Sequence, residues 1–412
     1  MIEWAKENLE DVCIKVTDGT HDSPKSVISG GYPLIKGKDI SSGFIDFVNC
    51  EFISESDHLD VISRSKPEYK DTLFTNIGNS IGDCVYINST REFSIKNIAL
   101  FKPNKDVVHP KFLFYTVISD QFKGEIWGKI SGSAQPFASL SLLRSHKINL
   151  PPLPAQQKIA KILSNYDDLI ENNLKRIKLL EESARLTYEE WFLRFRVDGK
   201  KLDIDAATNL PFGWEYSGLN NISTFTNGYA FKSKDFVEYG HPVIKIKNID
   251  GKMVDVHNTN RISANDVLKV NDKFKLHEGD LLIAMTGATV GKLGFVPYSN
   301  DACYLNQRVG KIQSEYLFFT FLALSGTSGQ KQILNFAGGA AQPNISGDQI
   351  LAVKNIIPAK DILDKFELLS NNALSQILNF TRKNQLLKEA RDILLPRLMT
   401  GMIDTDDMDI AV

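Results

Sequence analysis

Few residues in this chain are spaced as catalytic or metal-binding groups usually are. The seven histidines show no metal-ligand spacing such as His-Glu-x-x-His, and the four cysteines are scattered without a Cys-x-x-Cys pair. The chain has no Asn-Pro-Pro-Tyr or Asp-Pro-Pro-Tyr sequence for amino-methyl transfer, and no Pro-Asp dipeptide that would begin a set of nuclease carboxylates. The sequence therefore predicts no catalytic residue and no metal site in this chain.

A glycine-rich segment comes nearest to a phosphate-binding motif but fails its spacing. Residues 286–292 read TGATVGK, with three residues between the glycines where a P-loop has four, and Leu293 follows where a P-loop has Ser or Thr. We expect a tight loop between two strands, because glycine permits φ > 0 there. The glycines of this loop and of a similar earlier segment are Gly78, Gly82, Gly287 and Gly291. Direct DNA contact and a purely structural hairpin both remain open, and the candidate contacts are Gly78, Gly287, Thr289 and Lys292.

Four lysines occupy paired positions in two similar segments. Lys36 and Lys38 lie in one predicted strand region, and Lys245 and Lys247 in the other. Because side chains alternate along a strand, both lysines of each segment should share one face. A solvated sheet face and contacts to DNA phosphates, which carry no sequence information, both remain open.

The neighbours of these lysines differ between the two segments. Asp39 stands in the first segment and Asn248 in the second. If these positions approach base edges, Asn pairs with adenine and Asp accepts from cytosine. Asp39 and Asn248 are therefore candidate base-reading residues.

Two polar, glycine-containing loops occupy similar places but differ in their residues, namely 17–21 and 224–231. An ordinary turn is one interpretation. Loops that differ between related domains are also where different recognition would be encoded. The candidate DNA-binding residues in the two loops are Thr17, Asp18, Thr20, His21, Asn227 and Tyr229. Three further candidates, in two Gln-Pro segments, either cap local backbone or reach DNA: Gln135, Gln342 and Asn344.

These candidates recur because the chain contains an internal repeat. Four blocks of similar sequence recur at nearly constant offsets, in order 209, 209, 207 and 210 residues. The matching pairs are 32–40 with 241–249, 71–82 with 280–291, 132–139 with 339–346, and Trp4 and Leu9 with Trp214 and Leu219. Chance similarities would scatter, so the chain is a duplicated unit of a globular domain followed by a long helix.

Two long segments have the apolar spacing of helices. Apolar residues recur at steps of three and four in 155–195, and 361–399 has similar spacing. An apolar stripe of this length needs a partner. We expect the two segments to pack as an antiparallel coiled coil within the chain, with the globular domains at opposite ends of it.

The predicted fold class is α+β, with two pseudo-symmetric globular domains separated by the helix pair. Short apolar runs bounded by Gly, Asp, Asn and Ser suit strands, whereas 111–121 and 314–324 suit helices. The predicted strands include 12–16, 33–40, 72–76 and 84–87. The predicted segments are 1–153 for the first domain, 154–196 for the central helix, 197–358 for the second domain with its linker, and 359–412 for the C-terminal helix and an acidic tail.

The composition narrows the class of protein. The chain has 412 residues and a formal charge of −2, which gives no global attraction to DNA. No signal peptide and no apolar run long enough to span a bilayer are visible, and the scattered cysteines suit a reducing cytoplasm. We expect a cytoplasmic protein in which any DNA binding uses local patches or charge supplied by partners.

Several blocks, in this order, resemble the specificity subunit of type I restriction–modification systems. The blocks are the duplicated layout, GDLLIAMTGATVGK at 279–292, AQPNIS at 341–346, LPPLPAQQKIAKIL at 150–163 and LLPRLMTG at 394–401. The resemblance extends over nearly the whole chain. It implies two target-recognition domains, each reading one half of a bipartite, asymmetric double-stranded DNA site, with the long helices as spacer and docking surface.

The same resemblance implies a non-catalytic subunit in host defence. Its partners would be two methyltransferase (M) subunits, each flipping out an adenine for methylation, and two motor–nuclease (R) subunits. S-adenosylmethionine, ATP and magnesium would then belong to the partners and not to this chain. The helix residues expected to dock methyltransferase subunits are Leu163, Tyr166, Ile170, Trp191, Phe192, Phe366, Leu369 and Leu394.

Two other functions stay open on the sequence alone. A self-contained restriction or methylation enzyme would need catalytic motifs that the chain lacks. A coiled-coil scaffold without a DNA role would tolerate changes in the polar loops freely.

Overall fold

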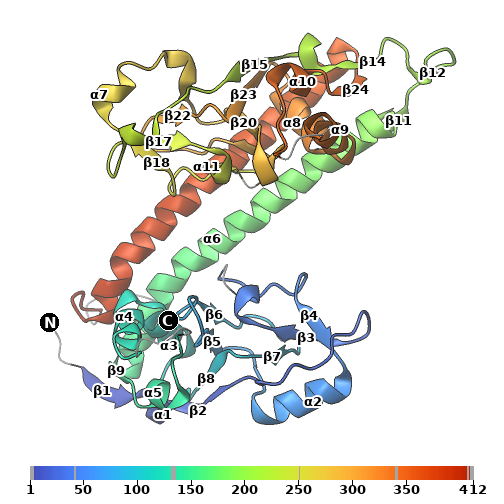
Figure 1. The fold of residues 1–412 in the computed structure, drawn as a ribbon. Coiled ribbons are helices and arrows are strands. Elements are labelled where there is room, and N and C mark those ends of the chain that lie inside the picture. The colour runs from blue at the N-terminus through green and yellow to red at the C-terminus, as the bar shows by residue number, and fades with distance from the viewer. Residues whose placement is uncertain are drawn as a thin grey trace. The chain divides into compact units, whose positions relative to one another are not determined.

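The computed structural model describes residues 4–40, 43–130, 136–249, 251–338, 342–405 and 408. The chain divides into two compact units. Unit 1 comprises Met1–Leu169 and Leu387–Val412, and unit 2 comprises Ile170–Leu386. Each unit contains one globular domain and segments of both long helices (Figure 1). Domain 1 is the chain before residue 153, and domain 2 is the chain from residue 194 to residue 359.

The two long helices are α6 (Leu153–Tyr188, 36 residues) and α11 (Lys360–Met399, 40 residues). Helix α6 continues as a single π-helical turn, Glu189–Leu193. Pro154 lies in the first turn of α6, where a backbone N–H has no helical partner to lose. These bounds confirm both predicted helices, which at ~1.5 Å per residue are roughly 54 to 60 Å long.

The two helices run antiparallel wherever they pair. In unit 1, Arg391 of α11 donates a hydrogen bond to Asp167 of α6 over 2.6 Å. In unit 2, the buried Asn173 donates to the buried Asn384 over 2.8 Å. Residue numbers fall along α11 as they rise along α6, so the antiparallel pairing predicted from the apolar stripes is confirmed.

Domain 1 contains two sheets and a short strand pair. The first sheet is antiparallel, in the order β2 (Cys13–Asp18), β8 (Ala99–Pro103), β5 (Thr72–Phe74) and β6 (Cys84–Tyr86). The second has the order β4 (Glu51–Ile53), β3 (Tyr32–Ile35) and β7 (Ser94–Ile95), with β3 parallel to β7. The pair is β1 (Ala5–Asn8) with β9 (Lys147–Leu150). The predicted strand 33–40 is wrong at its end, because β3 stops at Ile35 and a 3-10 turn follows.

Domain 2 repeats this plan. Its first sheet has the order β15 (Ser223–Asn227), β23 (Val309–Ser314), β20 (Leu281–Ala284) and β21 (Leu293–Phe295). Its second has the order β16 (Phe236–Val237), β18 (Asn260–Ile262), β17 (His241–Ile244), β22 (Cys303–Leu305) and β19 (Lys275–Leu276). Strand β14 (Glu215–Gly218) pairs with β24 (Lys354–Ile357). Strands β17 and β22 are parallel, as β3 and β7 are in domain 1.

Helices complete each domain at matching places. Domain 1 has α1 (Leu9–Val12), α2 (Glu55–Arg64), α3 (Pro110–Ile118), α4 (Asp120–Trp127) and α5 (Leu140–Arg144). Domain 2 has α7 (Ala264–Val267), α8 (Leu317–Ser325), α9 (Thr327–Ala337) and α10 (Gly347–Leu351). Helices α3 and α8 confirm the helices predicted at 111–121 and 314–324, with shifted ends.

The segment predicted as a linker forms two small hairpins. They are β10 (Arg196–Val197) with β11 (Lys200–Lys201), and β12 (Ile204–Asp205) with β13 (Leu210–Pro211). Val197 and Trp214, near its ends, are buried in the core of unit 2. The linker is therefore packed on the domain. Most of the acidic tail lies outside the described residues.

The long helices contribute to the core of each domain. In unit 1, Ile159 of α6 and Leu398 of α11 belong to the same buried cluster as Phe112 of α3. In unit 2, the ring of Phe192 lies 4.9 Å from that of Phe366, between centroids. Burying an aromatic side chain of this kind contributes roughly 1.5–3 kcal/mol, so each domain is held on its helices by apolar contact.

Each long helix also caps a helix of its domain. The carboxylate of Glu367, on α11, accepts hydrogen bonds from the backbone N–H groups of Phe318 (3.0 Å) and Phe319 (3.3 Å), at the start of α8. In domain 1, the amide oxygen of Gln156, on α6, accepts from the N–H of His109 at 2.7 Å, just before α3. All three bonds satisfy N–H groups that a helix leaves without partners. The caps therefore fix the orientation of each domain helix on the long helix.

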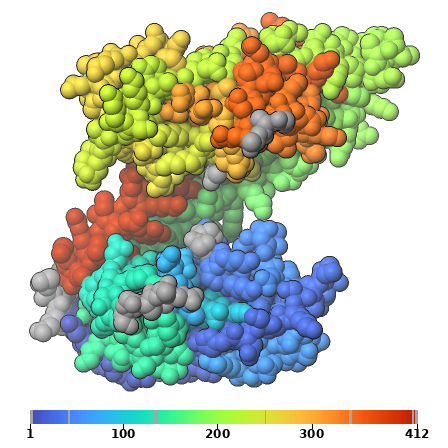
Figure 2. All heavy atoms as spheres, viewed as in Figure 1, coloured from blue at the N-terminus to red at the C-terminus, as the bar shows by residue number. Residues whose placement is uncertain are grey.

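The space-filling view shows that each globular domain is built from one continuous stretch of chain, blue to blue-green for domain 1 and yellow-green to orange for domain 2 (Figure 2). None of the helices in the described part of the chain has the length and apolar character that crossing a membrane requires.

Candidate nucleic-acid interface

The glycine loops join equivalent strands in the two domains. Gly78 and Gly82 lie between β5 and β6, with φ of 79° and 102°. Gly287 and Gly291 lie between β20 and β21, with φ of 76° and 83°. The predicted tight loop with positive φ is confirmed in both copies. In domain 2 it contains a short 3-10 turn, Gly287–Thr289.

The Gln-Pro segment of each domain is bonded to its glycine loop. The N–H of Gly78 donates to the carbonyl of Pro136 over 2.8 Å, and the N–H of Gly287 donates to that of Pro343 over 3.0 Å. Two blocks that are distant in sequence are therefore one structural unit in each copy. Gln342 and Asn344 are exposed beside the loop, and Gln135 lies outside the described residues. Their contact with DNA stays a prediction.

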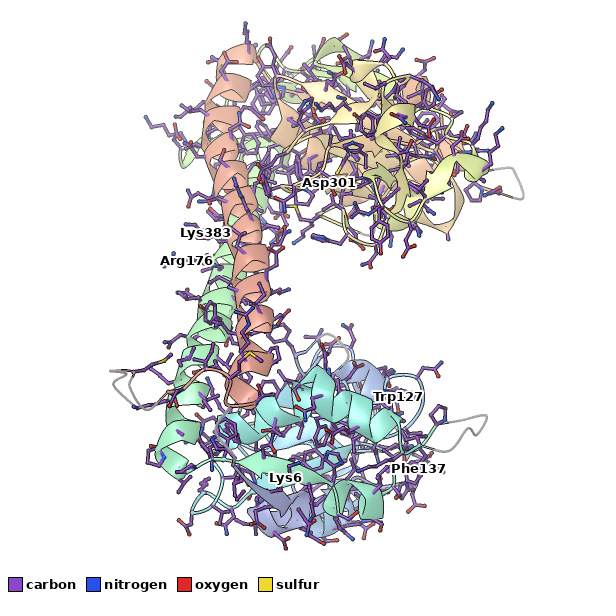
Figure 3. The ribbon with its side chains drawn as sticks, turned by 90° about the vertical axis from the view of Figure 1, so that its left-hand side faces the viewer. Lys6, Trp127, Phe137, Arg176, Asp301 and Lys383 are labelled. Atoms are coloured by element: carbon purple, nitrogen blue, oxygen red, sulfur yellow. The ribbon has the colours of Figure 1, made fainter. Side chains whose placement is uncertain are left out.

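Two exposed aromatic residues flank the glycine loop of domain 1. The indole N–H of Trp127 donates to the carbonyl of Ile81 over 3.2 Å, and Phe137 forms a β-bridge with Ile77. Both aromatic side chains lie on the same side of the domain (Figure 3). The equivalent positions in domain 2, at the same offset of 207, are Leu334 and Asn344. The surroundings of the two loops thus differ although their backbones agree.

The four lysines follow strands instead of lying within them. Lys36 and Lys245 precede the 3-10 turns Gly37–Asp39 and Ile246–Asn248. The predicted alternation along a strand is therefore wrong. Lys38 and Lys247 are exposed on the turns, and their contact with phosphates stays a prediction.

Asp39 and Asn248 hold the backbone of these turns. The Asp39 carboxylate accepts from the Lys36 N–H over 2.9 Å, and the Asn248 amide oxygen accepts from the Lys245 N–H over 3.0 Å. Both side chains are buried. Burial, together with a backbone partner, gives each a structural role, so the prediction that they read base edges is wrong.

The first lysine of each turn has a different environment in the two domains. The ammonium of Lys36 lies 2.5 Å from a Glu51 carboxylate oxygen, and this hydrogen bond lowers the pKa of Glu51. The ammonium of Lys245 lies 3.8 Å from the centre of the Phe236 ring, and burial followed by the charge of Lys247 lowers its pKa. A carboxylate thus neutralises the lysine in domain 1, whereas an aromatic face covers it in domain 2.

Each polar loop contains a glycine at a position where no side chain would fit. A Cβ atom on Gly19 would lie 2.1 Å from the carbonyl oxygen of Ile95, and one on Gly228 would lie 2.0 Å from that of Asn306. The next residues, Thr20 and Tyr229, then bridge to the end of a neighbouring strand. Asn227 and Tyr229 are exposed and stay candidates, as do Thr20 and His21.

The prediction that Thr17 and Asp18 contact DNA is wrong. Both are buried, and the Asp18 carboxylate bonds Arg64 and the Nε2 atom of His21, the latter at 3.1 Å. These contacts hold the loop from inside the domain, so their side chains are not presented to a ligand.

The turns and the glycine loops meet in each copy. A Cβ on Gly37 would lie 3.3 Å from a methyl of Thr75, beside the first loop, and one on Gly287 would lie 3.7 Å from Ile246, on the second turn. Thr289 and Lys292 lie on the same loop as Gly287, and their role stays a prediction.

Sequence reasoning missed the residues that follow β7 and β22. They are Lys96 and Asn97 in domain 1, and Asn306, Gln307 and Arg308 in domain 2. These strands are two and three residues long, too short for a periodicity argument. A weak signal existed, because Ile95-Lys-Asn97 and Leu305-Asn-Gln307 agree in type at an offset of 210.

Most residues predicted to dock partners lie in the core instead. Leu163, Ile170, Trp191, Phe192 and Phe366 are buried within the chain, so this part of the prediction is wrong. Their burial follows from the covering of each helix by its antiparallel partner and by a domain. The other three keep exposed surface and stay candidates: Tyr166, Leu369 and Leu394.

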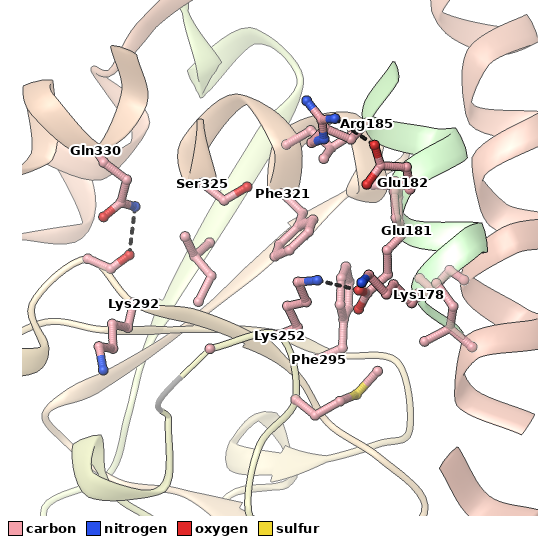
Figure 4. Close-up of a pocket in the computed structure, with 18 residues that line it drawn as sticks. Lys178, Glu181, Glu182, Arg185, Lys252, Lys292, Phe295, Phe321, Ser325 and Gln330 are labelled. Atoms are coloured by element: carbon pink, nitrogen blue, oxygen red, sulfur yellow. Dashed lines mark hydrogen bonds and ion pairs between the residues drawn. The ribbon is translucent and has the colours of Figure 1, made fainter. Parts of the chain in front are cut away.

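An open pocket of about 490 Å³ lies in unit 2 between α6, α8 and strand β21. Phe295 and Phe321 form part of its apolar floor, and charged residues of α6 form one rim (Figure 4). On that rim Lys252 pairs with Glu181. Within the part of the chain that the structure describes, no cluster of three His, Cys, Asp or Glu residues is placed to hold a metal ion.

The family comparison matches both copies of the repeat. The model of a family described as the type I restriction modification DNA specificity domain matches residues 1–182 and again residues 211–388. Together these ranges contain 360 of the 412 residues.

Named relatives match along nearly their whole length. The type I restriction enzyme MjaVIII specificity subunit of Methanocaldococcus jannaschii is 23% identical over 403 residues, covering 93% of this chain and 91% of the relative. The putative type I restriction enzyme MjaX specificity subunit of the same organism is 26% identical over 417 residues, covering 97% and 94%. A crystal structure of a type I restriction–modification system S subunit from M. genitalium has a TM-score of 0.58 at 15% identity, covering 96% of each chain. At this identity the last match supports the fold alone.

Proposed function

The chain belongs to the family of type I restriction modification DNA specificity domains, and we propose on this premise that it is the DNA-specificity subunit of a restriction–modification complex. Each globular domain binds one half of a bipartite, asymmetric site on double-stranded DNA. Partner subunits then methylate or cleave the DNA that this chain selects.

One observation carries the proposal beyond family membership. The two domains share their backbone scaffold down to equivalent hydrogen bonds, such as Gly78 to Pro136 and Gly287 to Pro343. The side chains around that scaffold differ, with a half-buried Thr20 in one domain where an exposed Tyr229 stands in the other. A constant scaffold with variable exposed residues is what two readers of different sequences require.

The long helices carry an apolar surface suited to partner subunits. Leu179 and Leu186 of α6 are 68% and 44% exposed, and Leu386 and Ile393 of α11 are 51% and 55% exposed. The two pairs are related by the same offset of 207 residues. An exposed apolar pair present in both repeats fits a partner that binds twice, by laying an amphipathic helix along each surface. We assign this surface to two methyltransferase subunits.

This chain supplies recognition and assembly and no catalytic group. S-adenosylmethionine, with an adenine flipped from the duplex, belongs to the methyltransferase subunits. ATP and magnesium belong to two motor–nuclease subunits. Residues between the two domains on α6 act as a spacer, so inserting one helical turn there should change the number of unspecified bases and leave both half-sites unaltered.

Methylome sequencing of a host that carries the chain with its partner subunits tests the proposal. We expect methylated adenines within one bipartite motif. Exchanging residues 224–231 for the loop of another specificity subunit should alter one half of that motif only. An unaltered motif would favour a scaffold without a DNA role, and methyl transfer by the purified chain alone would favour a self-contained enzyme.

A further inference from the structure

Three chain segments end side by side at one edge of each domain. In domain 1, strands β3 and β7 run parallel, and Thr20 forms a parallel bridge to Lys96 just beyond β7. In domain 2, strands β17 and β22 run parallel, and Tyr229 bridges Asn306 just beyond β22. Parallel strands bring their carboxyl ends to one edge. We call these edges the recognition edges.

The backbone of the two recognition edges is the same. In domain 1, Lys96 N–H donates to the Ile35 carbonyl over 2.9 Å, and Asn97 N–H donates to the Thr20 carbonyl over 3.2 Å. In domain 2, Asn306 N–H donates to the Ile244 carbonyl over 3.2 Å. Gln307 N–H donates there to the Tyr229 carbonyl over 2.9 Å. Asn97 and Gln307 are therefore structurally equivalent positions on one scaffold.

The recognition edge of domain 2 has a cluster of aromatic side chains beside the amide of Gln307. The ring of Tyr229 lies 4.9 Å from that of Phe231 and 5.4 Å from that of Phe274, between centroids. Gln307 and Arg308 are exposed. Among the residues that the structure describes, neither of these two side chains has a hydrogen-bond or ion-pair partner.

The recognition edge of domain 1 is polar, and its side chains bond to one another. The Nδ1 atom of His21 lies 2.9 Å from the side-chain oxygen of Asn97, and its Nε2 atom contacts the buried Asp18. The Lys96 ammonium donates to the hydroxyl of Ser23. The amide of Asn97, which is equivalent to Gln307, is thus bonded to His21 within the domain. Lys96 is the cationic donor of this edge.

The side chains of the two recognition edges are suited to different base pairs. Gln forms a bidentate pair with the N6 and N7 atoms of adenine, and apolar side chains contact the methyl of thymine. A lysine donates to O6 and N7 of guanine. Resting on the proposed function, we infer that the recognition edges determine specificity. Gln307 with the aromatic cluster selects an A·T pair in one half-site, and Lys96 selects a G·C pair in the other.

The test replaces Gln307 by Glu in the full chain, expressed with its partner subunits, and maps methylated adenines. Glutamate has the same shape but only accepts hydrogen bonds, so it favours cytosine N4 over adenine. We expect one A·T position of one half-site to relax or change, with roughly 5- to 150-fold less methylation of the original site. The other half-site should not change. Gln313→Glu is the matched control, because that side chain lies on β23, outside the recognition edge, and accepts a hydrogen bond from Thr226.

Each outcome decides between defined possibilities. A wild-type chain without any bipartite motif overturns the proposed function itself. A normal wild-type motif that Gln307→Glu leaves unchanged overturns the inference alone. If Gln307→Glu abolishes methylation, Gln307→Ala decides: relaxation at one A·T position supports the inference, and an unchanged motif overturns it.

The second half of the inference uses Lys96→Gln in the same assay. We expect a G·C position in the half-site that Gln307→Glu leaves untouched to relax or to shift toward A·T. Lys129→Gln, on the same domain but outside the recognition edge, is the control. An effect of Lys96→Gln on the same half-site as Gln307→Glu, or on no base at all, overturns this half.

Discussion

One position of the contact between domain 1 and the long helices holds a polar network, whereas the equivalent position in unit 2 is apolar. The hydroxyl of Tyr115, on α3, donates to Asp167 over 2.5 Å, and Asp167 also accepts from Arg391. Helices α3 and α8, like helices α6 and α11, begin 207 residues apart. At that offset Leu322 and Leu374 replace Tyr115 and Asp167, and both line the open pocket.

The comparison shows that the duplicated scaffold tolerates two kinds of contact at this position. Burial, and then Asp167, raises the pKa of Tyr115, so this position of unit 1 is a buried network of polar groups. The equivalent position of unit 2 consists of two leucines that border an open pocket. Stability of the two units should therefore respond differently to pH, salt and truncation.

The largest contrast is expected with pH. Burial lowers the pKa of His58, His109 and His146, and all three lie in domain 1. Their stabilisation is present above the unfolded pKa of about 6.5 and is lost as the pH falls through the folded pKa. Each histidine contributes up to ~1.4 kcal/mol per pH unit in that window. Hydrogen-exchange protection factors of unit 1 should fall between pH 7.5 and 5.5.

Glu367 gives unit 2 the opposite response. Burial raises its pKa, so the stability it contributes is present below the unfolded pKa of about 4.3 and is lost as the pH rises through the folded pKa. Protection of unit 2 should therefore not fall in step with unit 1 on mild acidification. Equal loss of protection in both units would contradict this prediction.

Breaking the polar network should cost roughly 2–3 kcal/mol. Asp167→Leu leaves the Tyr115 hydroxyl without its acceptor and the Arg391 guanidinium with Asp392, and a partly buried group that loses its partner carries a cost of ~1–3 kcal/mol. Removing all three polar groups, with Tyr115→Phe and Arg391→Met added, should recover most of the loss. Chemical denaturation measures both. A triple variant less stable than the single one would show that the network is favourable as a whole.

A neutral polar pair in unit 2 allows a smaller test. Asn173→Leu removes the donor to Asn384, which stays buried and unsatisfied, at a cost of about 1–2 kcal/mol. Because the pair is uncharged, this cost should not depend on salt, whereas that of Asp167→Leu should shrink as salt rises. Denaturation at two ionic strengths makes the comparison, and equal salt dependence would contradict it.

The smallest effect concerns the first lysine of each turn. Lys245→Ala should lower the salt dependence of DNA binding by one contact, a slope change of ~0.9. Lys36→Ala should change it less, because Glu51 already neutralises that ammonium. In a Glu51→Gln background, Lys36→Ala should change the salt dependence of DNA binding as much as Lys245→Ala does. Binding measured over a series of salt concentrations checks this, and a larger slope change for Lys36→Ala would refute it.

Repeats and long periodic segments were predictable from the sequence. The offsets of 207 to 210 identified the two domains, and steps of three and four identified α6 and α11. Periodicity could not separate core from surface. It placed Phe366 and Leu369 on the same list, although one is buried and the other is 52% exposed. The exposed repeat of Leu179 and Leu386 follows from which faces are covered, which is a tertiary property.

The recognition edges were hidden for a different reason. Residues 33–40 look like one strand, but Asp39 bonds the Lys36 N–H and turns the chain. The side chain that stops the strand also looked like a base reader. The weak similarity of 95–97 to 305–307 does not show which strands pair, so Gln307 stands out only after β22 is paired with β17.

The antiparallel pairing of α6 with α11 also has a consequence in time. Domain 1 shares its buried cluster with Leu395, Leu398 and Met399, which a ribosome adds long after domain 1. At a synthesis rate of ~5–20 residues per second, the 211 residues from the end of α6 to the end of α11 take about 10 to 40 s to make. During that interval the apolar face of α6 is complete but has no helix to cover it. The nascent chain therefore exposes an apolar helix face that is prone to aggregation until α11 has been synthesised.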